Sequence, residues 1–291
     1  MILVTGHTGF IGKHVLNSLK YYFNTSVIGI SRKNELEDGN IGVDLTNSRL
    51  VKQLFSFLEP TTVVHFAANP NTKLDEEDSS KIIDDNIKST MNLLSCCRHN
   101  TKFIFASSVT VYGDQQNCHE LTPVDPKSIY ATTKLASENL INYFSKNNGI
   151  LGFNLRLCAT IGTGSTHGML HDFRKKIVAD SDRFPVFGNE PGSIKPFIHV
   201  NDVCRAVIHF IEQGKPGTYN ICPNDNLSVK SIAEMFIKKF KSNKKIHWAG
   251  ETWAGDNPQI LCSNKKLLDS GFTLEYPSSV DAVKGFLNEI Y

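Results

Sequence analysis

The sequence predicts an α/β protein with a doubly wound parallel sheet and a smaller, irregular C-terminal lobe. Through the first half of the chain, short β-branched runs alternate with amphipathic stretches, a pattern typical of a parallel sheet covered by helices. A glycine-rich turn directly follows the first apolar run. From residue 162 to residue 196, glycine, proline and polar residues interrupt the chain, which predicts shorter and less regular elements there.

The first half supplies strands and helices in alternation. Strands are expected at residues 2–5, 26–30, 62–67, 102–106 and 152–157. Apolar residues at helical spacing fill the intervening segments, and a helix is expected from residue 129 to about 146, with Leu135, Leu140 and Tyr143 facing inward. In the second half, residues 198–200 are expected as one more core strand before a helix from Asp202, and residues 228–241 as a further amphipathic helix.

The composition excludes several classes of protein. A formal net charge of +2 over 291 residues creates no field that would gather nucleic acid or an anionic membrane. No apolar run is long enough to span a bilayer, and the N-terminal run lacks the basic segment and cleavage site of a signal peptide. The seven cysteines lack CxxC spacing, so buried, reduced thiols and a cytoplasmic location are expected.

The glycine-rich turn predicts a dinucleotide site. Gly6, Gly9 and Gly12 stand between an expected strand and an expected helix. Glycines at this spacing allow a tight turn, a close approach of the backbone to a pyrophosphate and close packing of helix on strand. Ordinary turns also use glycine, but this context favours a Rossmann-like dinucleotide-binding domain. We expect that domain at residues 1–160, with residues 195–215 returning to it, and a substrate-binding lobe at residues 161–291.

The residues after the second strand bear on the choice between NAD and NADP. An acid that binds the ribose 2′-hydroxyl usually stands about 20 residues after the turn. Near that position the sequence has Ser31, followed by Arg32 and Lys33. The missing anion and the two cations favour a 2′-phosphate and therefore NADP. The alternative is that Arg32 and Lys33 only decorate a surface loop.

A tyrosine and a lysine predict the catalytic chemistry. Tyr130 and Lys134 stand four residues apart on an expected helix, so both face the same side. A neighbouring ammonium and a positive nicotinamide ring favour the phenolate and lower a pKa that is otherwise about 10. Such a tyrosine can take the proton of a substrate hydroxyl while hydride leaves the carbon. Ser107 and Ser108 end the preceding strand at the edge where a parallel sheet presents its ligand crevice, and one serine there can hydrogen-bond the reacting oxygen.

Together these motifs resemble the extended short-chain dehydrogenase/reductases, specifically the sugar-nucleotide epimerase/dehydratase branch. The likeness covers nearly the whole chain. It is carried by TGHTGFIG at residues 5–12, HFAA at 65–68, SSVTVYG at 107–113, YATTK at 130–134, LRL at 155–157, a VFG strand at 186–188 and FIHVNDV at 197–203.

The resemblance implies roles for individual residues. Ser108, Tyr130 and Lys134 would be the catalytic triad, and no metal ligand is assigned. The substrate would be a nucleoside-diphosphate sugar that contacts Ser108, Tyr130, His167 and Lys195. A homodimer would form through the helix bearing Tyr130 and the one at residues 86–98. Including Ser31 and Arg32 from the argument above, the NAD or NADP site would comprise Gly6, Gly9, Phe10, Ile11, Gly12, Ser31, Arg32, Asp44, Leu45, Ala67, Ala68, Asn86, Tyr130 and Lys134.

Departures from the family pattern narrow the chemistry. Val109 and Thr110 stand where dehydratases carry an Asp-Glu pair, so loss of water is not expected. Thr110 also stands where fucose-synthase-like members use a cysteine, so His167 is interpreted as a substrate-positioning contact rather than a proton donor. Lys195 stands where the branch often has arginine; it keeps a point charge for phosphate but loses the bidentate fork.

The chemistry that these departures leave is oxidation and reduction at one sugar carbon, usually C4. The favoured function is a nucleotide-sugar 4-epimerase that works through a transient 4-keto intermediate, with Tyr130 as acid and base. An NADPH-dependent 4-ketoreductase of a keto-deoxy sugar nucleotide needs the same residues and is the alternative. A non-catalytic dinucleotide-binding module is less favoured because both Tyr130 and Lys134 are present.

Overall fold

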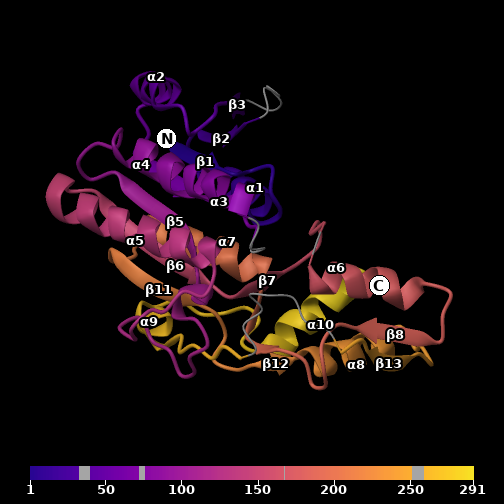
Figure 1. Ribbon diagram of the computed structural model, residues 1–291. Helices are drawn as coiled ribbons and strands as arrows, with labels where there is room; N and C mark the ends of the chain where they lie inside the picture. Colours follow the sequence, from indigo (N-terminus) through magenta and orange to yellow (C-terminus); the bar gives the residue numbers. More distant parts are fainter. Residues whose placement is uncertain (33–39, 72–75, 167, 251–258) are drawn as a thin grey trace.

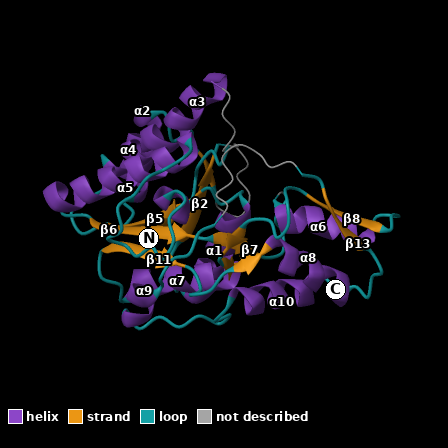
Figure 2. Ribbon diagram, turned by 60° about the horizontal axis from the view of Figure 1, so that its bottom comes forward, coloured by secondary structure: helices purple, strands orange, loops and turns teal. Residues whose placement is uncertain are grey.

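The computed structural model describes residues 1–32, 40–71, 76–166, 168–250 and 259–291 (Figure 1). Two residues singled out above, Lys33 and His167, lie outside the described residues. The chain folds into a helix-covered parallel sheet and a second, smaller cluster of short strands and helices that extends to one side of it (Figures 1 and 2).

The main sheet is a seven-stranded parallel sheet in the order β11-β6-β5-β4-β1-β2-β3. The order reverses between β1 and β4, so their carboxyl ends form the switch point where ligands bind in folds of this class. The predicted α/β doubly wound fold is therefore confirmed. The strands are β1 (Ile2–Thr5), β2 (Val27–Ser31), β3 (Ile41–Gly42), β4 (Thr62–His65), β5 (Lys102–Ser108), β6 (Leu151–Leu157) and β11 (Gly217–Ile221).

Helices cover both faces of this sheet, and each face has its own apolar cluster. In β1, Ile2 and Val4 join the cluster under α1 and α7, whereas Leu3 joins the cluster on the opposite face. This alternation follows from the two-residue period of a strand, and burial on both faces explains why the strands are continuously apolar. The flanking elements are α1 (Phe10–Tyr22), α2 (Ser48–Leu58), α3 (Glu76–Ile83), the π-helical turn η1 (Asp84–Lys88), α4 (Ser89–Leu94), the 3₁₀ turn η2 (Val109–Tyr112), α5 (Ile129–Asn148) and α7 (Val200–Glu212).

The smaller cluster is held by three two-stranded sheets and a core of its own, in which Phe173, Phe184 and Phe236 pack together. Its first strand, β7, continues directly from β6, and β10 pairs with it in parallel before the chain returns through α7 to the main sheet. Its elements are β7 (Ala159–Ile161), α6 (Met169–Val178), β8 (Arg183–Val186), β9 (Ile194–Lys195), β10 (Phe197–His199), β12 (Leu227–Ser228), α8 (Val229–Lys239), β13 (Lys245–Trp248) and α10 (Ser279–Glu289), while α9 (Lys265–Asp269) packs against β11.

The expected elements of the first half are present, with ends that move by one or two residues. In the second half, β8 ends at Val186, so the strand expected at 186–188 is wrong, and α7 begins at Val200 rather than Asp202. The sequence analysis predicted no strand at the position of β11. The sheet also takes this strand from beyond residue 215, the expected end of the returning segment.

Two predictions of burial are wrong. Tyr143, expected to face inward from α5, is 61% exposed, because the helix presents its other side to the sheet. Five of the seven cysteines are buried, but Cys96 and Cys97 are only half-buried. Within the described ranges, no helix is both long and apolar enough to cross a membrane.

Candidate active site

The glycine turn connects the carboxyl end of β1 to α1. Gly6 has a φ of +72°, a conformation that glycine adopts without strain. A Cβ atom on Gly12 would lie 2.2 Å from the Gly6 carbonyl oxygen, and one on Gly6 would lie 2.5 Å from the backbone nitrogen of Ala67. Close packing therefore requires both glycines. Gly9 is the N-cap of α1 and has no side chain to cap it, so first-turn N–H groups are left for a ligand.

A cavity of about 210 Å³ lies beside this turn, at the switch point of the sheet. Four segments close it: the end of β2, the residues that follow β3, the residues that follow β4, and η1 with the start of α4. Of the residues assigned to the dinucleotide, eight line it: Gly6, Gly9, Ser31, Arg32, Asp44, Leu45, Ala67 and Ala68. The sequence analysis assigned no cofactor contact to the other lining residues, of which Thr8 and Phe66 belong to its motifs: Thr8, Ile30, Val43, Thr46, Phe66, Asp85 and Ser89. Phe10, Ile11 and Gly12 belong to the adjoining first turn of α1.

Asn86 anchors the wall of this cavity from within η1. It is 3% exposed, and its Oδ1 accepts a hydrogen bond from the Asn69 backbone N–H at 2.7 Å. Its Nδ2 donates to the Asn69 carbonyl at 3.1 Å and to Thr133 Oγ1 at 2.9 Å. Asn86 therefore ties the chain after β4 to the helix that bears Tyr130, which is a positioning role beside the cavity.

Tyr130 and Lys134 lie on α5 and face the carboxyl end of β5. Lys134 is 3% exposed. Its Nζ donates to the Ala106 carbonyl at 2.7 Å and lies 5.5 Å from the centre of the Tyr130 ring. Burial lowers the pKa of Lys134 to about 7, an effect that the Glu138 carboxylate partly opposes. The spacing on the helix thus brings the two side chains together as expected.

The pKa of Tyr130 departs from the expectation. Burial raises it to about 12, whereas the sequence argument expected a neighbouring ammonium to lower it. The reason is that Lys134 donates to a backbone carbonyl and is itself buried, so its own charged form is disfavoured. In the protein alone, Tyr130 is a phenol and not a phenolate at neutral pH.

Ser108 ends β5 and caps the turn η2. Its Oγ accepts hydrogen bonds from the Thr110 backbone N–H at 3.2 Å and from Thr110 Oγ1 at 2.9 Å. With two donors on its oxygen, the hydroxyl of Ser108 retains its own proton to donate. Because α5 packs against both β5 and η2, Ser108 lies on the segment that faces Tyr130 and Lys134.

A buried ion pair holds these segments in place. Glu138 is one helical turn beyond Lys134, and Arg156 on β6 binds its carboxylate through Nε at 3.0 Å and Nη2 at 2.7 Å. The same carboxylate accepts a hydrogen bond from Ser107, the neighbour of Ser108. The two charged side chains are 3% and 6% exposed. This pair joins α5, β5 and β6 next to the catalytic residues.

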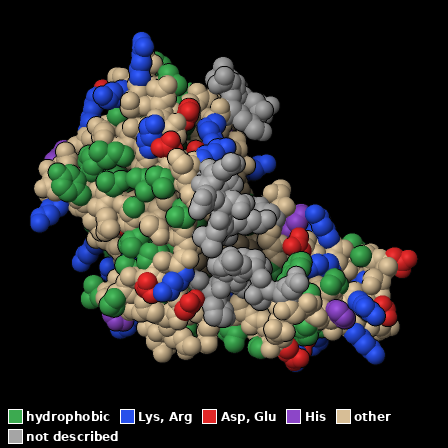
Figure 3. Space-filling view, viewed as in Figure 1, with side chains coloured by type: hydrophobic (Ala, Val, Ile, Leu, Met, Phe, Trp, Pro, Cys, Tyr) green, Lys and Arg blue, Asp and Glu red, His purple; other side chains and the backbone are tan. Residues whose placement is uncertain are grey.

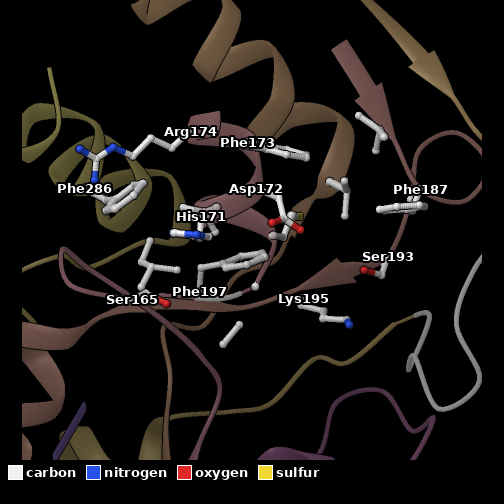
Figure 4. Close-up of a pocket in the computed structure, with 18 of the residues that line it drawn as sticks. Ser165, His171, Asp172, Phe173, Arg174, Phe187, Ser193, Lys195, Phe197 and Phe286 are labelled. Carbon is white, nitrogen blue, oxygen red and sulfur yellow. The ribbon is translucent and has the colours of Figure 1, made fainter. Parts of the chain in front are cut away.

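A second, larger cavity of about 1080 Å³ opens in the smaller cluster of strands and helices, here called the C-terminal cluster. Its lining includes Lys195, which is expected from the sequence to contact the substrate, together with Asp172, Phe187 and Ser193 (Figure 4). Lys176 Nζ lies 4.8 Å from the centre of the Phe187 ring. The cavity therefore offers an aromatic face and several cationic and hydroxyl groups.

Helix α1 connects the two cavities. Its N-cap, Gly9, lines the smaller one. His14 has its Nε2 2.9 Å from the carbonyl oxygen of Thr163, which lines the larger one. Glu289 of α10 accepts a hydrogen bond from the Thr163 N–H at 3.3 Å. Thr163, in the wall of the larger cavity, thus contacts both α1 and α10.

The structure brings most of the assigned residues to these two neighbouring sites. His167 lies outside the described residues. The sequence analysis assigned no role to Asn69, Asp85, Glu138 and Arg156. Three signals existed: Asp85 directly precedes Asn86, Glu138 repeats the four-residue spacing of Tyr130 and Lys134, and Arg156 lies within the LRL motif. In the described part of the chain, no group of three or more His, Cys, Asp or Glu residues could hold a metal ion.

Comparison with known proteins identifies a protein family that this chain matches. The model of the NAD dependent epimerase/dehydratase family matches residues 2–222. UDP-glucose 4-epimerase of Halalkalibacterium halodurans is 26% identical over 310 residues, which cover 95% of this chain and 91% of that protein. UDP-glucuronate 4-epimerase 4 of Arabidopsis thaliana is 26% identical over 241 residues, which cover 75% of this chain and 55% of that protein. The chain thus spans little more than half the length of this plant relative.

Among solved structures, the UDP-glucuronic acid 4-epimerase of Bacillus cereus, in complex with UDP-glucuronic acid and NAD, is 26% identical. Its TM-score is 0.85, with 99% of this chain and 98% of that chain covered. The similarity in space therefore extends over both the main sheet and the C-terminal cluster.

Proposed function

The chain belongs to the NAD-dependent epimerase/dehydratase family, and from this premise we propose that it is a nucleotide-sugar 4-epimerase. One observation carries the proposal. Tyr130, Lys134 and Ser108 gather at the carboxyl end of β5, while the position after Ser108 holds Val109 and Thr110, neither of which is a carboxylate. With a bound nicotinamide as hydride acceptor, this set would serve oxidation and reduction at a carbinol carbon, but it lacks the acid and base that loss of water would require.

The residues around the smaller cavity fit a dinucleotide. The packing that excludes a Cβ at Gly12 and Gly6 leaves a bare backbone turn at a helix N-terminus, a form suited to a pyrophosphate. We propose that Gly6, Gly9 and the first turn of α1 bind that group. Asp44, whose Oδ1 accepts hydrogen bonds from both Thr46 N and Thr46 Oγ1, would lie at the adenosine end.

The cofactor we propose is NAD, as in the Bacillus cereus structure. When bound, NAD would supply the acceptor and donor of hydride for this reaction. The positive charges of the bound nicotinamide ring and of Lys134 would favour the phenolate of Tyr130. In that form Tyr130 would take the proton of the sugar hydroxyl and give it back after the transient ketone has turned over. Lys134 stabilises the phenolate as a buried cation, and Ser108 donates its proton to the reacting oxygen as negative charge develops there.

The larger cavity would hold the nucleotide part of the substrate. Lys195 and Ser193 offer a charge and a hydroxyl to a diphosphate, and the Phe187 ring offers a face to a base. Because several relatives are named as UDP-sugar 4-epimerases, we propose a UDP-sugar. In this division, residues 1–160 with the returning segment, which extends to β11 in the main sheet, would hold the dinucleotide. The rest of residues 161–291, in the smaller cluster, would supply the substrate lobe.

A homodimer is also proposed, through the face formed by α3, α4 and α5. Ile83 is 44% exposed, Met91 39% and Tyr143 61%. Figure 3 shows hydrophobic side chains gathered over the region of α4 and α5. A contiguous apolar face of this kind is typical of a protein–protein interface.

The experiment is an equilibration assay. The purified protein is incubated separately with UDP-glucose, UDP-glucuronate and their C4 epimers, and the products are resolved by chromatography and proton NMR while absorbance at the reduced-nicotinamide band is followed. We expect one epimeric pair to interconvert with no net change in absorbance, and Tyr130→Phe to bind NAD⁺ but lose this activity. Stoichiometric consumption of NADPH with a 4-keto sugar nucleotide, without interconversion of epimers, would establish a ketoreductase instead.

A further inference from the structure

The smaller cavity contains an ion pair that the sequence pattern did not reveal. Arg32, at the end of β2, is 64% exposed, and its Nη1 lies 3.3 Å from Oδ1 and 3.5 Å from Oδ2 of Asp85. Both residues line the cavity. Arg32 was the residue expected to bind a 2′-phosphate, and here its guanidinium faces a carboxylate from an element 53 residues away.

Asp85 is held in place by its surroundings. It lies in η1, and π-helical turns often mark functional sites. Its side chain is only 13% exposed, and its Oδ2 also accepts a hydrogen bond from Asn69 Nδ2 at 3.3 Å. Asn69 is in turn bound through its backbone by the neighbouring Asn86, whose Oδ1 accepts from the Asn69 N–H at 2.7 Å. Asn69 thus contacts the side chains of both Asp85 and Asn86 in η1.

The charge of the cavity argues against an additional phosphate. Among the lining residues that the structure describes, Arg32 is the single cation, and Asp44 and Asp85 are carboxylates. A 2′-phosphate carries a charge of about −1.5 to −2 at neutral pH. A phosphate within reach of Arg32 would lie beside Asp85, and the repulsion would offset the attraction to the guanidinium.

We infer that Asp85 is the specificity-determining residue that makes this cavity select NAD over NADP. Its carboxylate takes the place of the acid that is missing at Ser31, and it accepts hydrogen bonds from the ribose hydroxyls of the adenosine half. Arg32 positions that carboxylate and does not serve as a phosphate ligand. The inference rests on the proposed function in one respect, namely that the cavity holds a dinucleotide.

The test is a titration of the cofactor-free protein with NAD⁺ and with NADP⁺ by isothermal calorimetry, which reads binding and not turnover. Wild type should bind NAD⁺ at least tenfold more tightly than NADP⁺. Asp85→Asn keeps the size of the side chain and its bond with Asn69, and should bind NADP⁺ about tenfold more tightly than wild type does. The double variant Asp85→Asn with Arg32→Ala should lose that gain, because the freed guanidinium supplies the attraction.

The matched control is Asp84→Asn, which removes one charge from an exposed position on the same turn and should leave both affinities unchanged. An NADP⁺ affinity in wild type equal to or above that for NAD⁺, or an unchanged preference in Asp85→Asn, would overturn the role of Asp85 while leaving the dinucleotide site intact. Absence of binding of either dinucleotide to a folded wild-type protein would overturn the proposed function and this inference together.

Discussion

Replacement of Lys134 by methionine should stabilise the cofactor-free protein. Lys134 is 3% exposed, and burial lowers its pKa from 10.5 to about 7. Methionine retains most of the aliphatic volume but has no charge to bury. The variant should lose catalysis, because the cation that would support the Tyr130 phenolate is gone. A gain in stability together with a loss of activity is typical of a residue retained for function.

The magnitude and the pH window follow from this pKa. Between pH 7 and pH 10.5 the unfolded chain binds a proton at Lys134 that the folded protein does not, so the free energy of unfolding rises with pH across this window. A displacement from 10.5 to about 7, at about 1.4 kcal/mol per pH unit, corresponds to about 5 kcal/mol of stability that is lost at and below pH 7. The hydrogen bond from Lys134 to the Ala106 carbonyl stabilises wild type by about 1–2 kcal/mol and so offsets part of this cost. We therefore expect Lys134→Met to be about 3 kcal/mol more stable than wild type at pH 7.

The assay is urea unfolding of both proteins from pH 6.5 to pH 10, after removal of any dinucleotide. The difference in the free energy of unfolding between the variant and wild type should shrink as the pH rises. It should change sign near pH 10, where the main remaining effect of the substitution is loss of the hydrogen bond to Ala106. Lys88→Met, at an exposed position on η1, serves as the control and should follow wild type at every pH. A gap that does not depend on pH, or a variant less stable than wild type at pH 7, would refute the reasoning.

Three further predictions follow from single contacts. Gly12→Ala places a Cβ 2.2 Å from the Gly6 carbonyl oxygen, so the turn must move and the Kd for NAD⁺ should rise at least tenfold in calorimetry; an unchanged Kd would count against the pyrophosphate site. Thr110→Val removes the hydroxyl that donates to Ser108 Oγ at 2.9 Å, and kcat should fall about tenfold while the Kd for NAD⁺ stays constant; an equal loss in both would indicate a structural defect. Tyr143→Asp puts a charge on the apolar face of α5 and should shift sedimentation from dimer to monomer, whereas a wild-type protein that is already monomeric would contradict the proposed interface.

The sequence by itself determined the fold class and most of the candidate site, because those features depend on neighbours along the chain. The glycine turn at Gly6–Gly12 combines a strand, three small residues and a helix within a few positions. The spacing of Tyr130 and Lys134 follows from the helical repeat alone. Alternating apolar runs likewise indicate strands buried on both faces.

Tertiary structure decided what depends on contacts between distant segments. Tyr143 and Leu140 share one helix and an apolar character, and only the packing of α5 on the sheet shows that Tyr143 faces outward. The pKa of Tyr130 rises and that of Lys134 falls because removal from water disfavours their charged forms, and burial is not a local property of sequence. In the sequence, Arg32 favoured NADP. The fold places Asp85 within 3.3 Å of Arg32, and this contact removes that argument, because the binding of a phosphate depends on the sum of nearby charges and not on one residue.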